Sequence, residues 1–204
     1  MEIENGRYRI QGLDLLELAD KYDTPLYVYD SACIKRQLDK LRNAFHVPDL
    51  DIHSACKALN NINILKLLNQ WGAGLDTVSI QEIWTGLKAG FDPSRIIYTP
   101  NCVGVDEIEM AMKLGVQINI DHIETLEYIG HHHPDAKICI RINPHVMAGG
   151  NEKISVGHID SKFGISIYQM PLVERLVKTL KLRINGLHMH TGSDILDAGV
   201  FSLA

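Results

Sequence analysis

The chain has 204 residues, of which 46% are hydrophobic and 22% are charged, a composition typical of a globular protein with one sizeable core. The formal net charge is -5 and the sequence contains no basic block, so nucleic-acid binding is not expected. Membrane association is not expected either, because no apolar run is long enough to cross a bilayer and the first five residues lack signal-peptide features. Four scattered cysteines without a CxxC pair indicate free thiols, and we expect a cytoplasmic protein.

The first fifty residues differ in pattern from those that follow. A helix is expected near Asp14–Tyr22, and Asp30 is a suitable N-cap for a second helix that runs to about Phe45. We expect residues 1–30 to form a lead-in that packs beside the main domain, which we place at residues 31–204.

From about residue 51 the sequence repeats a unit of one short apolar strand, one helix and one glycine. The first five units begin roughly 20–23 residues apart, which is the length of a compact strand–helix unit with short loops. The expected strands are Ile52–Cys56, Leu75–Val78, Ile96–Tyr98, Gln117–Ile120, Lys137–Ile142 and Ile184–His190.

Capping signals mark the helices between these strands. Ser79 and Glu82 have the spacing of a capping box, and Asp121 with Glu124 repeats the pattern with aspartate as the cap. Glycine accepts the left-handed backbone conformation that ends a helix, so four glycines are expected helix stops. They are Gly72, Gly90, Gly115 and Gly130.

Alternating strands and helices predict a parallel sheet, for which an open doubly wound sheet and a closed barrel both remain possible. A dinucleotide-binding open sheet would carry Gly-x-Gly-x-x-Gly in its first turn, whereas this chain has Cys56–Asn60 there. We therefore expect an α/β fold of the (β/α)8 TIM-barrel type. Six strands are recognisable where a barrel has eight, so we expect the front part of a longer protein. Open strand edges predict poor solubility for this chain alone.

Lys57 stands at the end of the first expected strand, just before an asparagine-rich helix start. The carboxyl ends of barrel strands are where such folds carry their chemistry. We expect the amine of Lys57 to be partly desolvated, which favours the neutral form that attacks aldehydes and forms Schiff bases. The alternative is a lysine that merely extends from a strand end into solvent.

Two histidines end the sixth expected strand. His188 and His190 are two residues apart and therefore point to the same side of the strand. They could bind a metal with Asp194 as a third ligand, one could be structural while the other lies flat on an aromatic ligand, or both could be core histidines without a ligand. Gly192–Ser193 offers backbone N–H groups and a hydroxyl to an anion, which favours phosphate over metal.

Two charged residues lie within expected strands. A carboxylate at Asp76 needs a partner if it faces the barrel interior, and Lys57 or a cofactor would supply one; a structural salt bridge is the alternative. Arg141 ends the fifth strand, where it would bind an anion at the barrel mouth or pair with Asp76.

Two further segments have competing interpretations. The insertion Asn143–Ile167 is long and glycine-rich, as functional loops are, and its final part, Ser161–Gly164, is either part of the site or a solvated loop. His131–His133 resembles a metal-binding tract, but we expect it in a surface turn away from the chemistry. The glycines of the insertion are Gly149, Gly150, Gly157 and Gly164.

Five motifs in the same order together resemble the diaminopimelate decarboxylase family, pyridoxal-phosphate enzymes with an alanine-racemase-like barrel. Each motif is weak alone, but the set spans nearly the whole chain. The motifs are Thr24–Asp30, Ala55–Ala58, Gly74–Ser79, Ser161–Gly164 and His188–Ser193.

The resemblance implies a role for each candidate residue. Lys57 would be the Schiff-base lysine, His190 would stack on the pyridine ring, and Ser193 would help to hold the phosphate of pyridoxal 5'-phosphate. Asp76 and Arg141 would line the cofactor pocket. The resemblance further implies a homodimer with shared active sites, a β-domain with which the lead-in belongs, and a cytosolic role in lysine biosynthesis.

The activity implied is decarboxylation of meso-diaminopimelate to lysine. The alternatives are a related decarboxylase of carboxynorspermidine or a basic amino acid, a racemase with the same barrel, and a cofactor-binding fragment without activity. The chain departs from the family at Ser54, where the family usually has an aromatic residue.

Overall fold

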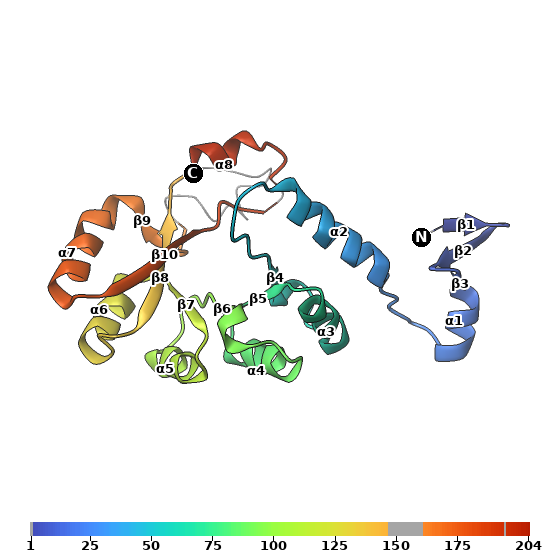
Figure 1. The fold of residues 1–204 in the computed structure, drawn as a ribbon, viewed down its shortest axis with the longest axis horizontal. Coiled ribbons are helices and arrows are strands. Elements are labelled where there is room, and N and C mark those ends of the chain that lie inside the picture. Colours follow the sequence, from blue (N-terminus) through green and yellow to red (C-terminus); the bar gives the residue numbers. More distant parts are fainter. Residues whose placement is uncertain (1, 147–160, 194) are drawn as a thin grey trace.

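The protein is described by a computed structural model that covers residues 2–146, 161–193 and 195–204. At the N-terminus, β1 (Glu2–Glu4), β2 (Arg7–Ile10) and β3 (Leu13–Asp14) form an antiparallel sheet, followed by α1 (Leu15–Tyr22). Asp14 caps α1 by accepting a hydrogen bond from the Leu16 amide at 2.9 Å, and its carboxylate lies 3.0 Å from Arg7 Nη1. This N-terminal unit stands apart from the rest of the molecule (Figure 1).

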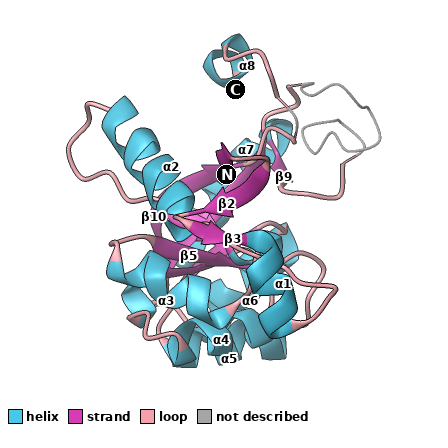
Figure 2. Cartoon of the chain, turned by 90° about the vertical axis from the view of Figure 1, so that its right-hand side faces the viewer, coloured by secondary structure: helices cyan, strands magenta, loops and turns pink. Residues whose placement is uncertain are grey.

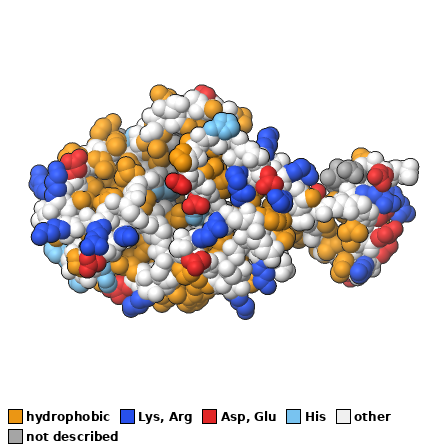
Figure 3. Space-filling model, viewed as in Figure 1, with side chains coloured by type: hydrophobic (Ala, Val, Ile, Leu, Met, Phe, Trp, Pro, Cys, Tyr) orange, Lys and Arg blue, Asp and Glu red, His pale blue; other side chains and the backbone are white. Residues whose placement is uncertain are grey.

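The N-terminal unit exposes several apolar side chains, and in Figure 3 hydrophobic groups lie among charged ones on the face in view. It is joined to the main body by α2 (Ser31–Ala44), whose N-cap is Asp30 as the sequence predicts. The Asp30 carboxylate accepts a hydrogen bond from the Cys33 amide at 3.0 Å. The exposed apolar residues of the unit include Ile3, Tyr8, Leu13, Leu16 and Tyr22.

Within the described residues, the main body is built on a seven-stranded sheet in the order β10-β8-β7-β6-β5-β4, with the short β9 also paired to β8. All pairs in this sheet are parallel. The strands are β4 (His53–Ala55), β5 (Gly74–Thr77), β6 (Ile96–Tyr98), β7 (Gln117–Ile120), β8 (Lys137–Asn143), β9 (Ile165–Ser166) and β10 (Arg183–Met189).

Helices α3 to α7 form an arc outside the sheet (Figures 1 and 2). Neighbouring strands follow chain order, whereas a doubly wound sheet reverses its order and carries helices on both faces. The expected barrel architecture, incomplete in this chain, is therefore confirmed. None of the helices in the described part of the chain is long and apolar enough to cross a membrane. The helices are α3 (Ile62–Gln70), α4 (Ile80–Lys88), α5 (Val105–Leu114), α6 (Ile123–His132), α7 (Met170–Leu180) and α8 (Gly199–Leu203).

The hydrophobic core lies between the sheet and this arc of helices. Its members come from strands such as β5 and β6 and from helices α3, α4 and α6, and the largest of them are almost completely removed from water. Burying a side chain of this size stabilises the fold by about 1.5–3 kcal/mol. Examples are Leu65, Leu75, Ile83, Ile96 and Leu126.

Three of the four expected helix stops are confirmed. Gly72, Gly90 and Gly115 follow α3, α4 and α5 with φ angles of +78°, +93° and +77°. The prediction for Gly130 is wrong, because this glycine lies inside α6. A Cβ at Gly130 would lie 2.6 Å from Leu180 Cδ1, so the glycine permits α6 and α7 to pack closely.

The two expected capping boxes have different outcomes. Ser79 Oγ accepts a hydrogen bond from the Glu82 amide at 3.3 Å, while the Glu82 carboxylate accepts one from the Val78 amide at 2.8 Å. The prediction that Asp121 caps the next helix is wrong, because His122 occupies the N-cap of α6. The Asp121 carboxylate is engaged in the polar network at the barrel mouth described below.

The histidine tract lies on the surface, as expected, but the prediction of a turn is wrong for two of its three residues, which are helical. His131 and His132 belong to the last turn of α6, and His133 follows it. The His132 ring stacks on Tyr128 with centroids 4.2 Å apart, and His133 Nε2 lies 3.3 Å from Glu109 Oε1. These contacts join the tract to α5 and to its own helix.

Candidate functional site

A cavity of about 590 Å³ opens beyond the carboxyl ends of the parallel strands. This volume lies in the range of small-molecule and cofactor sites. All five residues that the sequence singled out for cofactor binding line it. The lining residues are Ala55, Lys57, Asp76, Val78, Thr99, Asn101, Arg141, Lys162, Phe163, His188, His190 and Ser193.

Lys57 lies on a single 3-10 turn, Cys56–Ala58, that follows β4 directly. Cys56 is fully buried, and burial, followed by the charges of Glu82 and Asp76, raises the pKa of its thiol to about 11. The next helix begins at once, with Asn61 as its side-chain cap. The turn is thus anchored on both sides of Lys57.

The expectation that Lys57 is partly desolvated is wrong for this structure. The side chain is exposed, because the turn carries it past the strand end to the open side of the cavity. The amine therefore lies at the rim of the cavity and is accessible from solvent.

Asp76 lies on β5 and receives its hydrogen bond from Thr99, which donates Oγ1–H to Asp76 Oδ1 at 2.7 Å. Burial raises the pKa of the Asp76 carboxyl above its ordinary value, and this hydrogen bond and then the positive charge of Lys57 offset only part of that rise. The Thr99 hydroxyl in turn accepts a hydrogen bond from Asn119 Nδ2 at 3.0 Å. From the sequence we expected Lys57, Arg141 or a cofactor to be the partner of Asp76. The hydrogen-bonded side chains of Thr99 and Asn119 were not predicted.

Arg141 is a buried cation on β8, with only 6% of its surface exposed. Its guanidinium lies over the ring of Phe163, with 4.8 Å from Cζ to the ring centroid. Burial lowers the pKa of Arg141, while the negative charges of Asp121 and Asp76 oppose that change. A buried, charged guanidinium of this kind is suited to pairing with an anion.

His188 and His190 both face the cavity, as their spacing predicts, while Leu187 and Met189 between and beside them are exposed. The pKa of His188 is lowered to about 4, mainly by burial and then by Arg141 and His190. Burial, followed by the nearby positive charges, also lowers the pKa of His190. Both rings are therefore neutral near pH 7, which suits stacking on a ring.

The metal-binding alternative for these histidines named Asp194, which lies outside the described residues. Within the described ranges, no cluster of three or more histidine, cysteine or acidic side chains has an arrangement suited to a metal ion.

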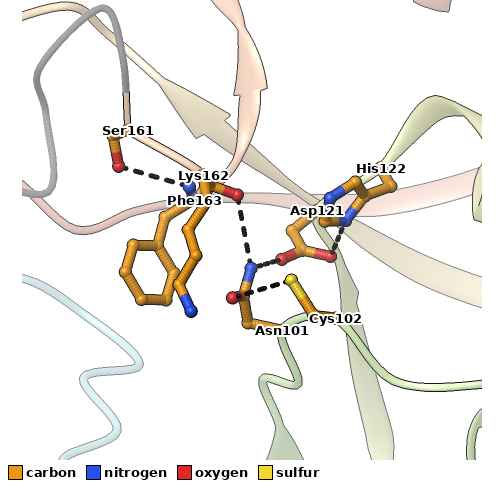
Figure 4. A network of polar contacts seen from close by, with 7 residues as sticks. All are labelled: Asn101, Cys102, Asp121, His122, Ser161, Lys162 and Phe163. Carbon is orange, nitrogen blue, oxygen red and sulfur yellow. Dashed lines mark hydrogen bonds and ion pairs between the residues drawn. The ribbon is translucent and has the colours of Figure 1, made fainter.

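A polar network at the mouth of the cavity was not anticipated (Figure 4). The Asn101 side-chain amide donates to Asp121 Oδ2 at 2.6 Å and to the backbone carbonyl of Lys162 at 3.3 Å. The other oxygen of Asp121 lies 2.6 Å from His122 Nδ1. Their positions in the sequence could have indicated this network, because Asn101 and Asp121 each follow the carboxyl end of a predicted strand by one to three residues.

This network holds the segment Ser161–Gly164 against the barrel mouth. Within the segment, Ser161 Oγ accepts a hydrogen bond from the Phe163 amide at 3.2 Å. Lys162 and Phe163 both line the cavity, so the segment is part of the site rather than a solvated loop. Gly149, Gly150 and Gly157, in the preceding part of the insertion, lie outside the described residues.

Comparison with known families agrees with this site. Residues 31–204 match the profile of the pyridoxal-dependent decarboxylases, specifically of their pyridoxal binding domain. The chain belongs to the pyridoxal-dependent decarboxylase family. Its cofactor is accordingly pyridoxal phosphate.

Several relatives within this family resemble the chain over almost its whole length. It is 41% identical to a diaminopimelate decarboxylase of Methanothermobacter thermautotrophicus, with 98% of this chain and 48% of the relative covered. A solved diaminopimelate decarboxylase of M. jannaschii in complex with L-lysine superposes with a TM-score of 0.84 at 30% identity, covering 98% of this chain and 49% of that one. A Helicobacter pylori diaminopimelate decarboxylase complexed with L-lysine has a TM-score of 0.81 at 34% identity, with 90% and 48% covered. The chain thus spans about half the length of the relatives it matches.

The cavity fits the chemistry of pyridoxal phosphate. It combines an accessible amine, a buried guanidinium and a hydroxyl, which suit an aldehyde and a phosphate, with the apolar side chains of Ala55, Val78 and Phe163.

Proposed function

We propose that the protein decarboxylates meso-diaminopimelate to lysine with pyridoxal phosphate as its cofactor. One observation supports this most strongly: the five residues singled out by sequence line a single cavity. They do so in a chain 41% identical to a protein named diaminopimelate decarboxylase.

Each of the five candidate residues that line the cavity has a proposed role in holding the cofactor. Lys57 would hold it covalently, because a lysine amine condenses with an aldehyde. The ring of His190 would lie against the pyridine ring, and Ser193 would bind the phosphate with its hydroxyl. Asp76 and Arg141 would set the charge of the pocket around it.

The bound cofactor supplies an electron sink for the bond that breaks when carbon dioxide leaves. The chain's own residues supply orientation and charge. Arg141 offers a guanidinium to an anionic group, and Phe163 on its face limits how that guanidinium turns. Lys57 is also a group that can return a proton to the substrate carbon once it is free of the cofactor.

The proposal extends to organisation and location. We assign residues 31–204 to the cofactor-binding barrel domain and residues 1–30 to a lead-in that belongs with a β-domain. The exposed apolar surface of the N-terminal unit supports this, because such patches are usually covered in a complete assembly. We further propose a homodimer, and a cytosolic location that agrees with four free cysteines.

The first test maps the lysine that reacts with the cofactor. The purified chain is incubated with pyridoxal phosphate, reduced with borohydride and digested for mass spectrometry. We expect selective labelling of Lys57, and no label there in Lys57→Arg, which keeps the charge but cannot form the bond. Lys162→Ala is the matched control, because Lys162 is a second lysine that lines the same cavity. Labelling of Lys162, or of many lysines equally, would contradict the assignment.

The second test measures turnover by the protein at the full length of its coding sequence. Carbon dioxide release is compared for meso-diaminopimelate, carboxynorspermidine, ornithine and arginine, and Lys57→Ala should abolish it. Release from another substrate would assign the protein to a related decarboxylase. Racemisation without carbon dioxide would indicate a racemase, and light scattering of the same sample would test the dimer.

A further inference from the structure

We propose that Thr99 and Asn119 are positioning residues that hold Asp76 as a hydrogen-bond acceptor beside Lys57, so that a carboxylate faces the cofactor site. This inference rests on the proposed function of the cavity. Neither residue is an obvious candidate in the sequence, and Asn119 does not line the cavity at all.

The three side chains form a directed chain across three neighbouring strands. Asn119 on β7 donates Nδ2–H to Thr99 Oγ1 at 3.0 Å, and Thr99, just beyond β6, donates to Asp76 Oδ1 on β5 at 2.7 Å. The Thr99 backbone is itself fixed, since its amide donates to the Thr77 carbonyl at 2.7 Å. Asn119 and Thr99 are only 4% and 6% exposed, so solvent competes little for these bonds.

The direction of the chain follows from the chemistry of its members. A threonine hydroxyl has a single hydrogen to donate. Because the Asn119 amide donates toward the Thr99 oxygen, the hydroxyl hydrogen is left for Asp76. The arrangement therefore favours an ionised carboxylate at Asp76 Oδ1, since a carboxylate accepts hydrogen bonds more strongly than a neutral acid does.

The surroundings of Asp76 explain why a hydrogen bond from Thr99 would matter. Burial disfavours the ionised form of the Asp76 carboxyl. Ionisable groups from several elements interact with this carboxyl. The positive charges of Lys57 and Arg141, and of His53 when it is protonated, favour the ionised carboxylate, and their effects are smaller than that of the Thr99 hydrogen bond. Two further titratable groups interact electrostatically with Asp76: the His190 ring, just after β10, and the Cys56 thiol. The Thr99 hydrogen bond is thus the largest contribution that opposes burial.

The test titrates Asp76 directly in the protein at the full length of its coding sequence, without cofactor. Aspartate is labelled with 13C at its carboxyl carbon, Asp76→Asn identifies the resonance, and NMR follows it with pH. Thr99→Val removes the hydroxyl in a similar shape, and the pKa of Asp76 should rise by about one unit, as expected for losing a hydrogen bond to a charged group. Thr99→Ser keeps the hydroxyl and should restore a value close to that of the unaltered chain. Asn119→Ala leaves Thr99 in place but frees its hydroxyl to turn, so a smaller rise is expected.

A second readout connects the titration to the cofactor. Thr99→Val should require several-fold more pyridoxal phosphate for half-maximal labelling of Lys57, and Thr99→Ser should not. An unchanged Asp76 titration in a folded Thr99→Val variant, or a changed titration with unchanged labelling, would overturn the inference. Absence of Lys57 labelling in the unaltered chain would instead refute the proposed function, and the NMR titration would still report on the hydrogen-bond chain. If Thr99→Val does not fold, Asn119→Ala provides the same comparison, and an unshifted titration there would refute the role of Asn119.

Discussion

Gly164 provides a sharp test of how the segment Ser161–Gly164 is held against β8. Its φ angle is +79°, a conformation in which an L-residue is strained. A Cβ at this position would lie 2.9 Å from the backbone nitrogen of Asn143 and 3.0 Å from the carbonyl carbon of Ile142. Both are atoms of a paired strand that cannot rotate away, so Gly164→Ala must displace the segment itself.

The magnitude follows from a matched glycine elsewhere in the barrel. Gly115 has nearly the same φ angle, +77°, but a Cβ there would meet nothing closer than Pro93 Cβ at 3.8 Å. Gly115→Ala should therefore lose only the conformational term, about 1 kcal/mol. Gly164→Ala should lose the same term plus about 1–3 kcal/mol for overpacking. The difference between the two variants isolates the contact with β8.

Urea unfolding of both variants, monitored by circular dichroism, measures this difference. Gly164→Ala should also weaken labelling of Lys57 by pyridoxal phosphate, because Phe163 and Lys162 next to it line the cavity. Gly115→Ala, at the far end of α5, should leave labelling unchanged. Equal destabilisation by the two substitutions would show that the close approach to β8 does not restrict the segment, and the reasoning would fail.

Two further predictions concern a helix cap and a buried histidine. Asp30→Ala removes the cap of α2 and should lower the free energy of unfolding by about 1 kcal/mol. Asp39→Ala removes two ion pairs of the same helix, with Lys35 and Arg42, between partly exposed side chains, and should have a smaller effect. Equal effects in urea unfolding would contradict the capping role. The pKa of His188 is lowered to about 4 in the folded chain, while an unfolded histidine takes up its proton near pH 6.5, so its contribution to stability is full above about pH 6.5 and is lost as the pH falls toward 4. The unfolding free energy of the unaltered chain should therefore fall relative to that of His188→Gln as the pH falls through this window, and parallel curves would refute the prediction.

Much of the local architecture could be predicted because its signals are local. Apolar runs at regular spacing marked six of the seven parallel strands to within one residue and missed the two-residue β9. Asp30, Gly72 and Gly115 marked helix ends, because capping and left-handed backbone depend on neighbouring residues only. The position of Lys57 after the first strand followed from the same pattern.

The errors arose where a residue's role depends on distant partners. Gly130 has the local character of a helix stop, yet it serves the packing of α6 on Leu180, fifty residues away. Asp121 has the spacing of a helix cap, yet its carboxylate binds Asn101 from the neighbouring strand end. Tertiary proximity outweighed the local preference in both cases.

The sequence by itself determined the order of strands and helices, the barrel class and the strand ends at which chemistry was expected, because periodicity, caps and turn residues act over a few positions. Only the tertiary structure decided that Lys57 is exposed at the rim and that Asn119 reaches Asp76 through Thr99. These features depend on which side chains the parallel register brings within hydrogen-bond distance. Residues about twenty positions apart become neighbours only when the strands pair.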